Sequence, residues 1–481
     1  MSFEFPPAIN SLDERLPLII QGGMGINVSC WHLVNRVARL GEMGVVSGTA
    51  FDSLFIRILQ DGDADGNMRR ALQHFPDQDV VARILDKYFI EGGKDPDKPY
   101  QLGEMFRQVP SQALLELTVA ANFANVFLAK EGTKGPVGIN LLEKVQLPNL
   151  ASLYGAMLAG VDAVLMGAGI PKYIPAILDR FALHEPASML LNVEDALPDE
   201  KFYSHFNPRT VLTQPDAELK RPKFFAIIAS DVLAKMLLRR PEGETNGFVI
   251  EGPTAGGHNA PPRKKGLFNE RGEPIYGGLD EADLETIKDL GLPFWLAGSY
   301  LAKLDTALSY GASGVQVGTA FAFCNESGLT DDIKQEVIRG VLAGTIDIVT
   351  DPRASPTGFP FKVVQLKGTL SEETTYALRS RVCDLGYLRH LYRKENGKLD
   401  YRCPSEPVAA FLRKGGIEEE TVGRKCLCNA LMSCVGQGQV RKDGVEGALQ
   451  TAGDEVLRLG AFLQGRTSYS AKDVIDFILA T

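Results

Sequence analysis

Short runs of apolar residues, each ending in glycine or another small residue, recur along the first two-thirds of the chain. They cover residues 18–23, 43–48, 136–141, 161–167, 224–230, 247–252, 293–298 and 314–319. Continuous apolar runs of this kind are typical of parallel strands that are buried on both faces. Stretches with helical spacing follow several of them, for example residues 232–240 and 300–308. The alternation predicts an α/β fold, a (β/α)8 TIM barrel, with an open doubly wound sheet as the alternative.

The uneven spacing of these runs divides the chain into a barrel domain and additions to it. The barrel is expected within residues 1–350, with insertions at about residues 49–134 and 185–222. After about residue 350 the alternation stops, and residues 351–481 are predicted to form a mainly helical C-terminal extension. A chain of 481 residues exceeds what one hydrophobic core usually supports, in agreement with a large domain plus an appendage.

Composition and charge narrow the class of protein. Apolar residues make up 44% and charged residues 23% of the chain, which is ordinary for a globular enzyme. The net charge of −9 argues against a nucleic-acid partner, because such proteins carry a basic footprint. The N-terminus lacks the basic start and apolar run of a signal peptide, and no apolar stretch of about 18 to 20 residues stands out. We therefore expect a cytoplasmic protein without a membrane span.

The end of the sixth predicted strand carries the most informative residues for chemistry. Gly256 and Gly257 precede His258 there. In a parallel barrel, function lies at the C-terminal ends of the strands, and adjacent glycines allow close approach to a ligand. Imidazole exchanges a proton near neutral pH, so His258 is the candidate catalytic residue. A structural histidine in a glycine-rich turn is the alternative.

The ends of the last two predicted strands favour a phosphate site. Ala297, Gly298 and Ser299 lead into an expected helix, and Gly318 and Thr319 end the last strand. Backbone N–H groups at glycines and at a helix N-terminus bind phosphate, often after strands seven and eight of a barrel. Tight turns without a ligand are the alternative. Further candidates around the same mouth are Gly22, Gly23, Met24, Asn140, Gly167 and Glu251.

Cysteines gather in the extension, where five of the seven lie beyond residue 380. Grouped thiolates bind zinc or iron–sulfur clusters, and Cys403, Cys426, Cys428 and Cys434 are the candidate ligands. Their spacing matches neither paired Cys-x2-Cys knuckles nor a ferredoxin run. The alternative, buried thiols that behave as small hydrophobic side chains, is favoured.

Five segments in a fixed order resemble the nitronate monooxygenase (2-nitropropane dioxygenase) family of FMN flavoproteins. The segments are residues 17–25, 138–141, 255–258, 297–298 and 318–321, and the resemblance covers roughly residues 15–345. It implies non-covalent FMN at the barrel mouth, with His258 in the position of the family's active-site histidine.

Two departures from the family pattern bear on function. Ser299 stands where the family commonly has a second glycine, which puts one backbone contact to the phosphate in doubt. The chain is also longer than a typical member, and residues 318–328 look more like the flavin enoyl reductase components of polyunsaturated fatty acid and trans-acting polyketide synthases. Those proteins reduce an enoyl thioester on an acyl carrier protein.

The resemblance leaves three functions open. The first is an NAD(P)H-dependent FMN enoyl reductase with a carrier-bound acyl substrate and a synthase or acyl carrier protein as partner. The second is a nitronate monooxygenase, which oxidises alkyl nitronates with O2. The third is a flavin-binding structural subunit of a synthase complex. A homo-oligomer is expected in each case.

Overall fold

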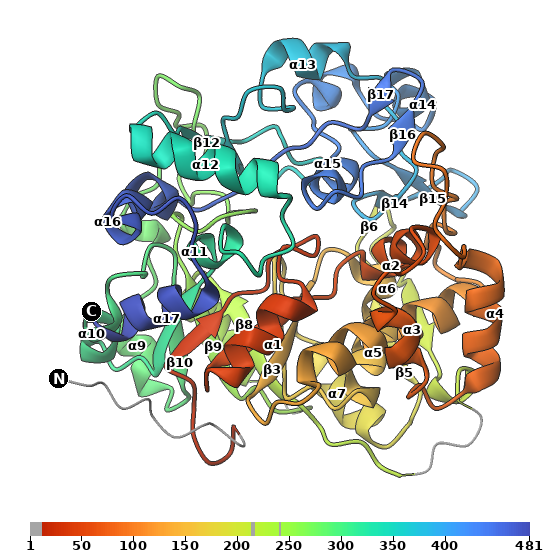
Figure 1. The fold of residues 1–481 in the computed structure, drawn as a ribbon. Coiled ribbons are helices and arrows are strands. Elements are labelled where there is room, and N and C mark those ends of the chain that lie inside the picture. Colours follow the sequence, from red (N-terminus) through yellow and green to blue (C-terminus); the bar gives the residue numbers. More distant parts are fainter. Residues whose placement is uncertain (1–11, 213–216, 240–241) are drawn as a thin grey trace.

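The barrel predicted from the apolar runs is present in the computed structural model, which describes residues 12–212, 217–239 and 242–481 (Figure 1). Eight parallel strands close in the order β1-β11-β10-β9-β8-β4-β3-β2. They are β1 (Ile19–Gln21), β2 (Met43–Ser47), β3 (Val137–Leu142), β4 (Ala163–Gly167), β8 (Lys223–Ile228), β9 (Gly247–Glu251), β10 (Phe294–Ala297) and β11 (Gly314–Val317). Each matches one of the eight predicted runs, so the open sheet is excluded.

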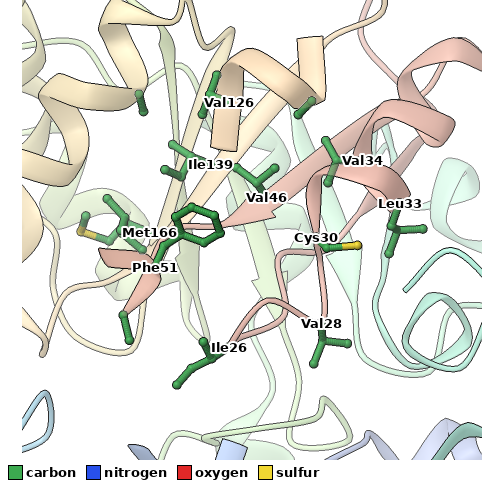
Figure 2. Close-up of a cluster of buried hydrophobic side chains, with 14 of the residues drawn as sticks. Ile26, Val28, Cys30, Leu33, Val34, Val46, Phe51, Val126, Ile139 and Met166 are labelled. Carbon is green, nitrogen blue, oxygen red and sulfur yellow. The ribbon is translucent and has the colours of Figure 1, made fainter. Parts of the chain in front are cut away.

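Two apolar layers hold the barrel together. Alternate strand residues point inward, and Ile20, Leu165, Phe225 and Trp295 belong to the cluster that fills the barrel. The Trp295 indole also donates a 2.8 Å hydrogen bond to the Pro17 carbonyl. The intervening residues pack outward against helices, and Figure 2 shows part of this second cluster, including Val34, Val46, Phe51, Val126 and Ile139.

Helices surround the barrel, and the first insertion is itself helical. The helices of the first 350 residues are α1 (Trp31–Arg39), α2 (Phe51–Gln60), α3 (Asn67–Leu72), α4 (Gln78–Tyr88), α5 (Gln112–Lys130), α6 (Gln146–Leu158), α7 (Ile174–Ala182), α8 (Asp231–Leu238), α9 (Leu284–Asp289), α10 (Leu304–Ser309), α11 (Thr319–Ala322) and α12 (Asp331–Ala343). By length and composition α5 is apolar enough to cross a membrane, which the sequence pattern did not bring out. Because 78% of its apolar window is buried, it fits a core helix.

The extension is not mainly helical, and this prediction needs correction. Its helices are short: α13 (Glu373–Leu378), α14 (Val408–Arg413), α15 (Leu427–Cys434), α16 (Leu459–Leu463) and α17 (Ala471–Leu479). The antiparallel pair β12 (Ile348–Asp351) with β13 (Phe361–Val364) precedes them. Between them lie the antiparallel pairs β14 (His390–Arg393) with β15 (Leu399–Arg402), and β16 (Val440–Arg441) with β17 (Gly444–Val445). Long irregular segments connect them, and these have no period that a sequence pattern could reveal.

The extension and the second insertion are joined by a shared sheet. Strand β6 (Val193–Glu194) of the insertion pairs in parallel with β14, next to β15. The other two strands of the insertion, β5 (Ala187–Leu190) and β7 (Tyr203–Phe206), form their own antiparallel pair. At the far end of the chain, α17 packs against α1. The extension therefore lies against the barrel at several points, and Figure 1 shows its blue segments running from α14 and α15 in the upper part of the view to α16 and α17 at the left.

Candidate active site

A deep cavity lies at the C-terminal ends of the barrel strands. All eight strands, or the loops that follow them, contribute to its wall. We call this part of the lining the barrel wall. It contains every candidate named from the sequence for catalysis or cofactor binding: Gly22, Gly23, Met24, Asn140, Gly167, Glu251, Gly256, Gly257, His258, Ala297, Gly298, Ser299, Gly318 and Thr319. Residues up to almost 300 positions apart thus meet around one space.

The extension supplies the remaining part of the lining, which sequence patterns did not reveal. This extension wall comprises Phe361, Tyr387, Leu388, Leu427, Cys428, Leu431, Cys434, Gln450, Thr451, Ala452, Gly453 and Glu455. Residues 351–481 are therefore part of the candidate site and not only an appendage beside it.

Close backbone packing explains several glycines of the barrel wall. A Cβ atom on Gly23 would lie 2.2 Å from the Asn140 Cβ, so only glycine fits next to this asparagine. A Cβ on Gly256 would lie 2.7 Å from the backbone carbon of Ala452, so the extension rather than a ligand makes the close approach there. Gly257 has a φ of +78°, which glycine adopts without strain. The predicted need for glycine holds, but its cause at Gly256 is different.

The two strand ends that predicted a phosphate site lie on the same side of the barrel wall, after the neighbouring strands β10 and β11. Gly298 has a φ of +90° and Ser299 one of +60°, so the backbone takes the left-handed region at both positions. The helix expected directly after Ser299 begins only at Leu304, whereas α11 does begin directly after Gly318. The Gly453 N–H of the extension donates to Thr319 Oγ1 over 2.9 Å, which secures this corner.

His258 connects the two walls of the cavity. Its backbone forms an antiparallel bridge with Phe361, and the two rings lie 4.9 Å apart at 71°. Its Nε2 shares a 2.7 Å hydrogen bond with the Oγ of the buried Ser355, which in turn contacts Thr357 Oγ1 at 2.8 Å. Burial, followed by the charge of Lys144, holds the pKa of His258 well below its usual range. The imidazole is thus uncharged at neutral pH.

Lys144 and Glu251 influence each other's charge beside the cavity, and sequence reasoning missed this relation. The Lys144 amine is buried without a hydrogen-bond partner and lies 4.2 Å from the centre of the Phe359 ring. Burial lowers the pKa of Lys144 to about 7, although Glu143 and Glu251 oppose the shift. Burial likewise raises the pKa of Glu251 to about 7, against the effect of Lys144. Lys144 follows Asn140 by four residues and so comes soon after the third predicted strand. This position was the one feature of the sequence that could have pointed to Lys144 as a site residue.

Tyr387 ties the extension wall to the first insertion. Its hydroxyl donates to Asp52 Oδ2 over 2.7 Å and lies 2.7 Å from Ser53 Oγ. Burial raises the pKa of Asp52 to about 6, and the hydrogen bond from Tyr387 opposes that shift. The two partners lie 335 positions apart, so no local pattern announces the contact.

The cysteines of the extension do not form a metal centre. Within the part of the chain that the structure describes, no group of three or more His, Cys, Asp or Glu side chains could hold a metal ion. The candidate ligands Cys403, Cys426, Cys428 and Cys434 are free, buried thiols. The structure therefore gives these four residues as buried thiols and groups no set of metal ligands from them in the described ranges.

The barrel wall fits a flat, phosphorylated ring system such as FMN. The glycines at the ends of β10 and β11 leave room for a phosphate beside backbone N–H groups. Two polar atoms of the lining, Thr49 Oγ1 and Gln316 Oε1, are buried without a hydrogen-bond partner. Buried polar groups are nearly always paired, so these atoms suit the polar edges of a bound ring.

The structure thus belongs to the class of parallel (β/α)8 barrels with a cavity at the C-terminal ends of the strands, and comparison with known sequences shows what it is similar to. Residues 214–352 match the family model for nitronate monooxygenase. A curated relative from Mycobacterium tuberculosis, (3aS,4S,5R,7aS)-5-hydroxy-7a-methyl-1-oxo-octahydro-1H-indene-4-carboxyl-CoA dehydrogenase, is 27% identical over 103 residues, or 21% of this chain. The chain spans about a quarter (26%) of that relative's length.

Solved structures give a looser likeness. FabK from Thermotoga maritima has a TM-score of 0.48 at 14% identity, over 97% of this chain and 93% of that one. Nitroalkane oxidase from Streptomyces ansochromogenes has a TM-score of 0.45 at 15% identity, over 98% and 96%. The enoyl reductase domain of MlnA from the macrolactin cluster of Bacillus amyloliquefaciens has a TM-score of 0.44 at 9% identity, over 97% and 95%.

Proposed function

We propose that this protein is an FMN-dependent enoyl reductase that uses NAD(P)H and acts on an acyl thioester presented by a carrier protein. The observation that carries the proposal is the space around His258. Besides the central cavity, there are two further pockets of about 340 and 300 Å³, and Phe359 lines both of them. One shares Tyr387 and Leu388 with the central cavity, and the other shares Glu251 and His258. An extended acyl chain needs such room, whereas a small nitronate does not.

The residues of the barrel wall have separate roles in this proposal. Gly298, Gly318 and Thr319 would hold the phosphate of FMN, and Met24 and Asn140 would contact its ring. Bound FMN supplies a hydride acceptor and donor that connects NAD(P)H with the β-carbon of the substrate. The protein supplies orientation and electrostatics around the thioester.

Two side chains would act on the thioester itself. The uncharged imidazole of His258, fixed through Nε2 by Ser355, presents its ring to the thioester carbonyl as a hydrogen-bond donor or proton carrier. Negative charge develops on that carbonyl oxygen when the β-carbon accepts a hydride. The nearby Lys144 amine, with a pKa of about 7, stabilises this charge in its protonated form.

Anaerobic mixing tests the proposal and its main rival. The purified protein is reconstituted with FMN, and the flavin absorbance is followed after addition of NADPH or NADH, and separately of an alkyl nitronate. Rapid bleaching by a pyridine nucleotide, followed by reoxidation with a crotonyl thioester, supports the reductase. Bleaching by the nitronate alone identifies a nitronate monooxygenase instead. Failure to bind FMN at all would overturn both.

A further inference from the structure

A small cavity within the extension brings four thiols together. Cys383, Cys403, Cys426 and Cys428 line a space of about 10 Å³. This volume accommodates about one water molecule. The sequence had singled out these cysteines, and the proposed function does not use them.

The four thiols differ in exposure and in ionisation. Cys383 is partly exposed, whereas the other three are buried. Hydrogen bonding with the Cys403 thiol lowers the pKa of Cys383, and Arg389 adds to this effect against the opposing effect of burial. The same hydrogen bond, together with burial, raises the pKa of Cys403 well above its usual range. Burial also raises the pKa values of Cys426 and Cys428. A partly exposed thiol, Cys383, thus lies on the same small cavity as the buried Cys403 thiol, an arrangement that suits a redox-active pair.

The position of this pair connects it to the candidate active site. Between Cys383 and Cys403 the chain contains the hairpin of β14 and β15, preceded by Tyr387 and Leu388 of the extension wall. Cys428 lines both the thiol cavity and the central cavity. A covalent link between Cys383 and Cys403 would therefore close a loop that holds part of the extension wall.

We propose that Cys383 and Cys403 are a redox-active dithiol that hydrogen peroxide converts into a disulfide. The Cys383 thiolate attacks one peroxide oxygen, the O–O bond breaks, and a sulfenic acid and hydroxide form. The Cys403 sulfur then attacks the Cys383 sulfur, the S–O bond breaks, and the S–S bond forms. The proton from Cys403 and one further proton convert the two released hydroxides to water. Two thiols lose two electrons, and one peroxide becomes two waters. This site does not depend on the proposed reductase activity.

Peptide mapping of the intact, folded protein tests the pair. The protein is treated with hydrogen peroxide, blocked with N-ethylmaleimide, and digested with trypsin without reductant. Cleavage after arginine and lysine places Cys383 on residues 382–389 and Cys403 on residues 403–413, apart from the other extension cysteines on residues 426–441. We expect a linked pair of the first two peptides, two hydrogens lighter than their sum, that disappears after treatment with dithiothreitol.

Variants identify the sulfurs involved. Cys383→Ser and Cys403→Ser should each abolish the linked peptide. Cys428→Ser, a matched change of a buried thiol in the same cavity, should retain it. Maleimide on both Cys383 and Cys403 of the wild-type protein after peroxide treatment would overturn the proposal. So would a link from either residue to the 426–441 peptide in place of the expected one.

Discussion

The two walls of the central cavity are built by different means. The barrel wall depends on backbone packing, as at Gly23, where a single added carbon would collide with Asn140. The extension wall and the extension residues behind it depend on side-chain hydrogen bonds to distant partners, as between Tyr387 and Asp52 or between Ser355 and His258. The barrel wall thus shapes the space for the proposed cofactor. The extension wall places polar groups beside it.

Within one site, the barrel wall therefore determines the shape of the cavity, and the extension wall determines the polar groups that face it. Substitutions that add volume to the barrel wall should reduce cofactor binding and stability. Substitutions that remove polar atoms near the extension wall should change turnover or its pH dependence while the cofactor stays bound. The four predictions below test this separation, from the largest expected effect to the smallest.

The largest effect is expected at His258, where the walls meet. His258→Ala should retain FMN and lose about 10²- to 10⁴-fold in turnover with NADPH and a crotonyl thioester, as for other general acid–base groups. Steady-state kinetics together with the flavin spectrum measure both properties. Unchanged turnover would remove His258 from the mechanism.

Ser355→Ala serves as the comparison within this prediction. It deletes one hydrogen bond worth about 0.5 to 1.5 kcal/mol, so turnover should fall far less than in His258→Ala. The pH profile of turnover should also shift, because the imidazole loses the partner of its Nε2 atom. A loss equal to that of His258→Ala would transfer the chemical role to the Ser355 hydroxyl.

The second effect concerns the shape of the barrel wall. Gly23→Ala places its Cβ 2.2 Å from the Asn140 Cβ, and overpacking of this kind costs about 1 to 3 kcal/mol. Urea unfolding should show this loss, and gel filtration should yield protein with less bound FMN. Gly278→Ala is the matched control, because a Cβ there meets nothing within 4 Å. Equal stability of the two variants would show that the barrel wall yields easily and does not define the cofactor space.

The barrel wall was largely predictable from the sequence, and the reasons are local. Strand ends such as Gly22–Gly23 and Gly256–Gly257 combine an apolar run with glycines inside a few residues, and the parallel barrel rule then brings them to one mouth. The same pattern could not say that Gly256 makes room for Ala452, because that neighbour lies almost 200 residues away. The local sequence pattern thus predicted that Gly256 lies at the site, but not why a glycine is needed there.

The extension wall was not predictable from the sequence, because its contacts join residues that are far apart along the chain. Ser355 and Tyr387 lie in segments without regular secondary structure, and their partners are 97 and 335 positions away. Lys144 is an intermediate case: it follows a recognisable strand, but its buried, unpartnered amine results from tertiary packing around Phe359. Neither periodicity nor motif spacing contains this information.

The third prediction uses the pH dependence of stability at Lys144. Its pKa is lowered to about 7 in the folded protein from an ordinary value of 10.5. The unfolded chain therefore binds more protons than the folded one between these values. The free energy of unfolding should rise with pH across this window and be lowest, for this group, below pH 7.

Lys144→Met should remove the loss of stability that the buried Lys144 amine causes at low pH. At pH 6 the variant should be more stable than the wild type by about 1 to 3 kcal/mol, the cost of a buried polar group without a partner. At pH 6 Glu251 is largely protonated, since its pKa is raised to about 7, so the lost partner matters little. Toward pH 10 the difference should vanish. Urea unfolding at both pH values measures the difference in the free energy of unfolding between the variant and the wild type. An equal increase at both pH values would mean that packing rather than charge is responsible.

The smallest effect is expected at Ser299, and it tests whether the barrel wall really acts through its backbone. Ser299 has a φ of +60°, which costs a residue with a side chain about 1 to 2 kcal/mol. Glycine relieves this strain but loses about 0.5 to 1 kcal/mol in chain entropy, so Ser299→Gly should gain at most about 1 kcal/mol. Ala168→Gly, at a cavity residue with a φ of +53°, is the matched control. If backbone N–H groups hold the phosphate, FMN affinity should be unchanged in both variants. Weaker FMN binding in Ser299→Gly alone would show that the serine hydroxyl contacts the phosphate, and the barrel wall would then also depend on a side chain for its chemistry.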